Sequence, residues 1–104
     1  MMQIILFYVP VPDRQTGKDL VKKALEARVA ACGNLLGPVT SFYEWESEIK
    51  EETEFVLLLK TAEAKAEALS CFLQSHHPYE CPCITQIPAT ANRPFVTWLQ
   101  QQTS

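Results

Sequence analysis

The residues best suited to chemistry lie in one short stretch, which reads SHHPYECPC and ends at Cys83. His76 and His77 offer imidazole nitrogens, while Cys81 and Cys83 offer thiolates, and both ligand types bind copper and zinc. If the two cysteines lie in extended backbone, their thiols share one face, because side chains alternate along a strand. The spacing lacks the C-x2-C…H-x3-H form of zinc modules, so a metal site is only one interpretation.

The same stretch also has a purely structural interpretation. A histidine at the end of a helix interacts favourably with the free carbonyl groups there. Pro78 prevents a helix from continuing past His77, and Cys83, entering a strand, would pack as a small hydrophobic residue. The residues alone favour this interpretation for the cysteines and leave both interpretations open for His76 and His77.

A second cluster is acidic and lies between two apolar segments. It comprises Glu44, Glu46, Glu48, Glu51, Glu52 and Glu54, against the single basic residue Lys50. A surface for hard cations or for a basic partner is one hypothesis. We favour the other, a solvated hairpin whose charges discourage edge-to-edge aggregation. Cys32 and Cys71 have no C-x-x-C partner, so we expect structural roles for both.

Composition excludes several classes of protein. The chain has 104 residues, 47% of them hydrophobic and 20% charged, which predicts one globular domain spanning residues 1–104. The net charge of −3 and the scattered basic residues argue against nucleic-acid binding. With three glycines and no phosphate-binding or nucleophile motif, the sequence gives no sign of an enzyme.

The expected location is the cytoplasm. The opening residues MMQIILFYVPVPD have no basic region and no small-residue cleavage site, so we expect no signal peptide. The four cysteines are then expected to be free thiols in a reducing compartment. No apolar run approaches the roughly 20 residues of a membrane span, so we expect no membrane partner.

Hydrophobic periodicity predicts four strands that must position these residues. The strands are expected at Gln3–Val9, Val39–Trp45, Thr53–Thr61 and Ile84–Pro88. The polar segment ESEIKEE is expected to join the second and third as a hairpin. A bulge or bend is expected at the Gly-Pro pair that precedes Val39.

Three helices complete the pattern. The first is expected to be capped by Thr16 and to end near Ala30–Ala31, and the second to be capped by Thr61. A short C-terminal helix is expected after Asn92. The order β-α-β-β-α-β plus a helix predicts an α+β, ferredoxin-like sandwich, with an antiparallel sheet covered by helices on one face. The uncovered face would expose Tyr43 and Trp45, which predicts self-association.

Several local strings together resemble one known family. AACGN, SFYEWESEI, LLLKT, HHPYECP, ITQIP and FVTWL occur in this order. They are similar to the corresponding segments of the CutA1 divalent-cation tolerance proteins, from Ile4 to about Leu99. The resemblance implies the ferredoxin-like fold, a homotrimer, and a role in the response to metal ions, copper above all. It places Tyr43 and Trp45 at or near subunit contacts.

The resemblance also implies a metal site. Copper binding in bacterial members is assigned to paired histidines, which match His76 and His77, and to a cysteine at the end of the first strand. This chain has about Val9 at that position, and Cys83 where the family usually has an acid. A thiol in place of a carboxylate would favour softer ions. Whether Cys81 takes part is left open.

A different function remains open beside metal binding. Ferredoxin-like trimers are also the architecture of PII signalling proteins, an analogy of fold alone. On that hypothesis, clefts between subunits would bind an anionic small molecule through residues such as Lys60 and Tyr79. No cofactor is expected to be required for folding.

Overall fold

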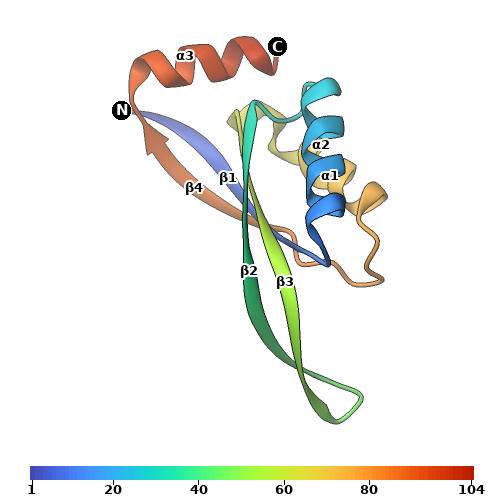
Figure 1. Cartoon of the computed structure of the whole chain (residues 1–104). Coiled ribbons are helices and arrows are strands. Elements are labelled where there is room, and N and C mark those ends of the chain that lie inside the picture. The colour runs from blue at the N-terminus through green and yellow to red at the C-terminus, as the bar shows by residue number, and fades with distance from the viewer.

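The computed structural model describes all residues, 1–104, and contains one antiparallel sheet with the strand order β2-β3-β1-β4 (Figure 1). Its strands are β1 (Met2–Val11), β2 (Cys32–Trp45), β3 (Glu48–Thr61) and β4 (Thr85–Ala91). The helices are α1 (Arg14–Glu26), the short 3-10 helix η1 (Glu63–Lys65), α2 (Ala66–His76) and α3 (Arg93–Gln102). This order confirms the predicted ferredoxin-like α+β fold.

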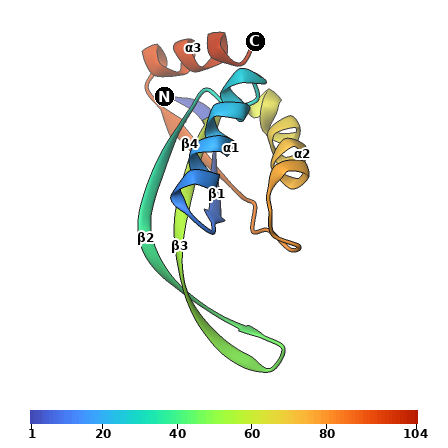
Figure 2. The same cartoon turned by 45° about the vertical axis from the view of Figure 1, so that its right-hand side comes forward.

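Helices α1 and α2 lie side by side on one face of the sheet (Figures 1 and 2). The main core forms where they meet β1 and β3, and it includes the fully buried Phe7, Val9, Leu57, Leu59 and Leu69. Residues at every second position of β1 and β3 enter this core, as the period of a strand requires. Helix α3 packs separately, with Val96 and Leu99 buried beside Ile4.

The hairpin of β2 and β3 extends well beyond the rest of the sheet as a long arm (Figures 1 and 2). Strand β1 pairs with β3 only from Thr61 back to Phe55, so residues 48–54 pair with β2 alone. The predicted bulge is confirmed by a shift of register between Leu36 and Val39. Gly37 has a φ of 143° there, and an added Cβ would lie 2.6 Å from the ring of Phe55.

The arm ends in a tight turn, not in the polar connection predicted from ESEIKEE. Glu46 and Ser47 form a two-residue turn, with φ values of 51° and 65°. Two successive positive φ values are typical of the turns that match the twist of a hairpin. The glutamates that follow the turn are therefore residues of the strand. Charged side chains are compatible with this part of the strand, because it is exposed to water on both faces.

Several predicted element boundaries were wrong. Helix α1 is capped by Asp13, whose carboxylate accepts a hydrogen bond from the backbone N–H of Thr16 at 2.7 Å, so Thr16 is not the cap. The helix ends at Glu26, and Arg28 follows with a φ of 59°. Thr61 closes β3 and caps no helix, because its buried hydroxyl donates to the carbonyl of Val29 at 2.7 Å.

Other boundaries moved as well: β2 begins at Cys32 and not at Val39, and β3 begins at Glu48 and not at Thr53. Asn92 is the residue before α3, as predicted, although its side chain makes no capping hydrogen bond. Strand β1 continues through Pro10, and β4 begins at Thr85, one residue later than predicted. None of the helices has the length and hydrophobicity that a membrane crossing requires.

The sheet face opposite α1 and α2 carries exposed apolar side chains. Tyr8, Leu36 and Ile87 on this face are each more than 40% exposed. Tyr43 and Trp45 pair with Lys50 and Glu48 of β3, and residues that pair across strands share a face of the sheet. Tyr43 and Trp45 therefore belong to the same face further along the arm, as expected.

Candidate functional groove

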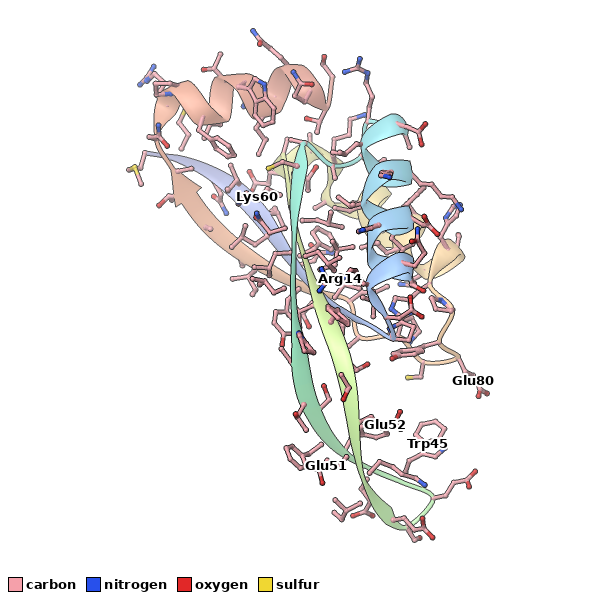
Figure 3. All side chains as sticks on the ribbon, in the orientation of Figure 1. Arg14, Trp45, Glu51, Glu52, Lys60 and Glu80 are labelled. Atoms are coloured by element: carbon pink, nitrogen blue, oxygen red, sulfur yellow. The ribbon has the colours of Figure 1, made fainter.

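The arm and the segment between α2 and β4 enclose an open groove of about 580 Å3. Figure 3 shows Trp45 and Glu80 on the same side of the arm, one from each wall. The lining residues are Pro10, Tyr43, Trp45, Lys50, Glu52, Glu54, Tyr79, Glu80, Cys81 and Cys83. The groove therefore brings together four predicted candidates, Tyr43, Trp45, Tyr79 and Cys83, with part of the acidic cluster.

Two tyrosine–glutamate pairs organise the groove. The hydroxyl of Tyr79 donates to Glu54 Oε2 at 2.6 Å, and the hydroxyl of Tyr43 donates a short hydrogen bond to Glu52 Oε1. Glu52 and Glu54 are two residues apart on β3, so their side chains leave the strand on the same face. Each carboxylate is thus oriented by a phenol, and Tyr79 joins the two walls.

These hydrogen bonds keep the phenols neutral. Burial raises the pKa of Tyr79, and the hydrogen bond to the Glu54 carboxylate raises it further. The hydrogen bond to Glu52 is the main cause that raises the pKa of Tyr43. Because the phenols keep their protons, the negative charge of the groove resides on its carboxylates.

His77 fixes the inner wall of the groove. It is buried, with its Nε2 2.8 Å from the carbonyl oxygen of Pro10. Its Nδ1 accepts a hydrogen bond from the backbone N–H of Tyr79 at 3.1 Å. This pattern requires the tautomer with hydrogen on Nε2, which donates to Pro10. Both ring nitrogens are therefore engaged, and His77 anchors the segment after α2 to β1.

His76 lies in a different environment. Its ring stacks on Phe72 with the centroids 4.1 Å apart, and Nδ1 is 2.8 Å from the Phe72 carbonyl oxygen. Nδ1 donates in this contact, which leaves Nε2 with a free lone pair on an exposed side chain. The two adjacent histidines therefore do not converge, and only His76 offers an open nitrogen.

The cysteines are separate from both histidines. Cys81 and Cys83 are exposed and line the groove, and Cys83 Sγ lies 3.4 Å from Thr85 Oγ1. Cys83 precedes β4 and is not a strand residue, so burial as a small hydrophobic residue was a wrong prediction. Within the chain no three His, Cys, Asp or Glu side chains gather to hold a metal ion. Val9, at the position of the family's cysteine, is fully buried in the core.

Lys60 and Tyr79 do not share a site within one chain. The ammonium of Lys60 hydrogen-bonds Asn34 Oδ1 at 3.3 Å and lies 5.9 Å from the ring centroid of Phe95, near α3. Tyr79 is surrounded by carboxylates, which would repel an anion. Figure 3 shows Lys60 and Glu80 far apart on the molecule. The predicted cleft lies between subunits, so its lining by Lys60 of one chain and Tyr79 of another stays a prediction.

Glu52, Glu54 and Glu80 were missed as groove residues by the sequence analysis. Alternation along the strand could have identified two of them, because Glu52 and Glu54 share the face of Tyr43 once the hairpin register is known. Nothing in the sequence pattern indicated that the segment after α2 would fold against the arm.

A ferredoxin-like sheet with an extended hairpin arm and an acidic groove beside HHPY defines a small α+β domain. A family model described as "CutA1 divalent ion tolerance protein" matches residues 5–102. The chain therefore belongs to the CutA1 divalent ion tolerance family.

Curated relatives and solved structures agree with this assignment. The divalent-cation tolerance protein CutA of Salmonella newport is 36% identical over 98 residues, which cover 93% of this chain and 85% of that protein. The human Protein CutA is 35% identical over 97 residues, covering 92% of this chain. The chain spans little more than half the length of that human relative, 54%.

The fold matches CutA1 structures along its whole length. The CutA1 structure from Ehrlichia chaffeensis aligns with a TM-score of 0.94 at 33% identity, covering 100% of this chain and 98% of the other. A CutA structure from Archaeoglobus fulgidus, described as periplasmic, aligns with a TM-score of 0.92 at 29% identity, covering 97% and 99%.

Proposed function

We propose that this chain acts as a cytoplasmic homotrimer that binds copper or another divalent metal ion weakly, as part of the response to metal ions, and that it is not an enzyme. Membership of the divalent ion tolerance family supports the relation to metals. The four cysteines are all free thiols, which suits a reducing compartment.

The exposed Nε2 of His76 is the observation that carries the metal proposal. It is the one nitrogen of the predicted pair that a metal ion can reach without breaking a hydrogen bond, since both nitrogens of His77 are engaged. His77 could become a ligand only by releasing Pro10 or Tyr79. A metal ion held by one imidazole, with its remaining coordination positions filled by water or by side chains of another subunit, is expected to bind weakly and not as in a tight structural site.

Apolar surface supports the homotrimer. Tyr8, Leu36 and Ile87 form an exposed apolar face on the side of the sheet opposite α1 and α2, where α3 packs only at the end near Ile4. Surfaces of this kind are commonly buried by association. Packing of three copies through this face, with Tyr43 and Trp45 near its margin, would remove the patch from water.

Copper titration of the purified protein tests the metal proposal. We expect a weak Cu(II) site by calorimetry that His76→Ala removes and that Lys65→Ala, a variant of a side chain away from the groove and the histidines, leaves intact. An unchanged affinity in His76→Ala would exclude this residue as the ligand. Light scattering coupled to gel filtration tests the assembly, and a mass of one chain, with no trimer at micromolar concentration, would contradict it.

A further inference from the structure

Glu54 and Lys60 are half-buried charged residues of β3, and neither has a partner of opposite charge within the chain. We propose that they form ion pairs between neighbouring chains of the homotrimer, in which the carboxylate of Glu54 in one chain binds the ammonium of Lys60 in the next. This inference rests on the self-association proposed above and names the charged residues that fix how the chains pack.

Glu54 is the one carboxylate of the chain that is not exposed. The only hydrogen bond to its side chain comes from the neutral hydroxyl of Tyr79, at 2.6 Å to Oε2. Tyr79 therefore orients the carboxylate without neutralising its charge, and Oε1 can accept from a second donor. A carboxylate oriented in this way is ready to receive a charge-assisted hydrogen bond from a cation.

Lys60 is a half-buried cation without a carboxylate partner. Its Nζ lies 3.3 Å from Asn34 Oδ1 and 5.9 Å from the ring centroid of Phe95. The only ion pair within the chain joins Lys50 to Glu48. An ammonium group has three donors, so Lys60 can bind a carboxylate in addition to Asn34.

Both residues lie on the sheet face that association is proposed to bury. Leu57 and Leu59 of β3 belong to the core beneath α1 and α2, so the even-numbered Glu54 and Lys60 are on the opposite face. That face also carries the exposed apolar side chains. Its burial removes both charges from water, which is unfavourable for a charge that stays unpaired.

The two charges cannot meet within one chain. They are six residues apart on the same strand, which separates them by about 20 Å. Figure 3 shows Lys60 and Glu52, the neighbour of Glu54 on this face, well apart along the sheet. In a three-fold ring each contact joins two different parts of the surface, so Lys60 of one chain can meet Glu54 of the next. Three identical pairs then leave neither charge without a partner.

The distribution of charge along the chain favours the same arrangement. Residues 44–54 of the arm include six glutamates and one lysine, although the net charge of the whole chain is only −3. The remainder of the chain is therefore net positive. Attraction between the arm of one chain and the remainder of the next orients the chains so that Glu54 approaches Lys60.

Exchange of the two charges tests the proposal, with assembly measured by light scattering coupled to gel filtration over a range of protein concentrations. Lys60→Glu and Glu54→Lys each place like charges opposite one another. Each should raise the concentration needed for assembly by about tenfold or more. The double variant Lys60→Glu/Glu54→Lys has opposite charges at every contact again and should recover most of the loss.

Lys65→Glu and Glu67→Lys are the matched controls, since Lys65 is a half-buried lysine of η1 and Glu67 an exposed glutamate of α2, both outside the sheet. We expect both to assemble as the natural chain does. If Glu54→Lys does not fold, a second cycle combines Lys60→Met with Glu54→Gln, which keeps an oxygen for the Tyr79 hydroxyl. The loss in that double variant should be smaller than the sum of the two single losses.

Two results would overturn the proposal. The first is a natural chain that forms the trimer while the single variants assemble normally or their losses simply add in the double variant. Glu54 and Lys60 would then not meet, and the homotrimer would stand without this pair. The second is a natural chain that remains a monomer, which would overturn the homotrimer and the ion pair together.

Discussion

The hydroxyl of Tyr79 donates to Glu54 Oε2 at 2.6 Å and so joins two segments that are 25 residues apart in sequence. One segment follows α2 and the other belongs to the arm. Without this bond the groove would have two walls but no link between them. The same bond, with burial, explains why the pKa of the Tyr79 phenol is raised.

Tyr79→Phe should remove a phenol that ionises at the high-pH end of the titration. Because the folded-state pKa is raised above the unfolded value of about 10, this group stabilises the fold fully below that pH. The stabilisation is lost as the pH rises through the folded-state pKa. The phenolate absorbance of the natural chain and of Tyr79→Phe, followed against pH, checks this. If Tyr79→Phe removes a phenol that ionises at the ordinary pKa of about 10, the Tyr79–Glu54 bond does not form in solution.

His77→Ala should destabilise the protein in the absence of any metal, by about 2–3 kcal/mol. The substitution removes both hydrogen bonds of a buried ring and leaves the Pro10 carbonyl and the Tyr79 N–H without partners. His76→Ala, at an exposed position, should change the free energy of unfolding by less than about 0.5 kcal/mol. Urea unfolding with a chelator present measures both, and equal effects would refute the separate roles.

Thr61→Val should cost about 1–2 kcal/mol, because it removes the hydroxyl that binds the Val29 carbonyl while preserving shape. This bond ties the end of β3 to the segment after α1. Thr61→Ser keeps the hydroxyl and should recover part of the loss, whereas Thr53→Val, on the exposed arm, should be nearly neutral. Thermal unfolding compares the three, and a neutral Thr61→Val would show that the bond contributes nothing.

Ser47→Gly should stabilise the protein by about 1 kcal/mol. Ser47 has a φ of 65° at the tip of the arm, a conformation that glycine adopts without steric cost. Ser47→Ala keeps the Cβ and should bring no gain. The midpoint of urea unfolding measures the difference, and a Ser47→Gly midpoint at or below that of the natural chain would contradict the turn geometry.

Patterns of hydrophobic residues predicted the fold well because burial decides it. Alternation and helical spacing placed four strands and three helices in the correct order, and the glycine–proline pair before Val39 marked the bulge. The ends of the elements were less predictable. Thr16 and Thr61 both have side chains that could cap a helix. Asp13 caps α1 instead of Thr16, and the hydroxyl of Thr61 donates to the Val29 carbonyl instead of capping α2.

The groove was only partly predictable for a similar reason. Tyr43, Trp45, Tyr79 and Cys83 were candidates by residue type, but their convergence depends on how the segment after α2 folds against the arm. A local pattern cannot specify a contact such as Tyr79–Glu54, which is set by tertiary packing. The adjacent histidines show the same limit, since one faces the interior and the other faces solvent.

The most direct test of the proposed function is a crystal structure of the assembled protein soaked in Cu(II), with the ion located by anomalous scattering. The account predicts a trimer with an anomalous peak about 2 Å from His76 Nε2. It also predicts that the hydrogen bonds of His77 remain intact. A copper ion found at the thiols of Cys81 and Cys83 with none at His76, or a monomer in the crystal, would contradict it.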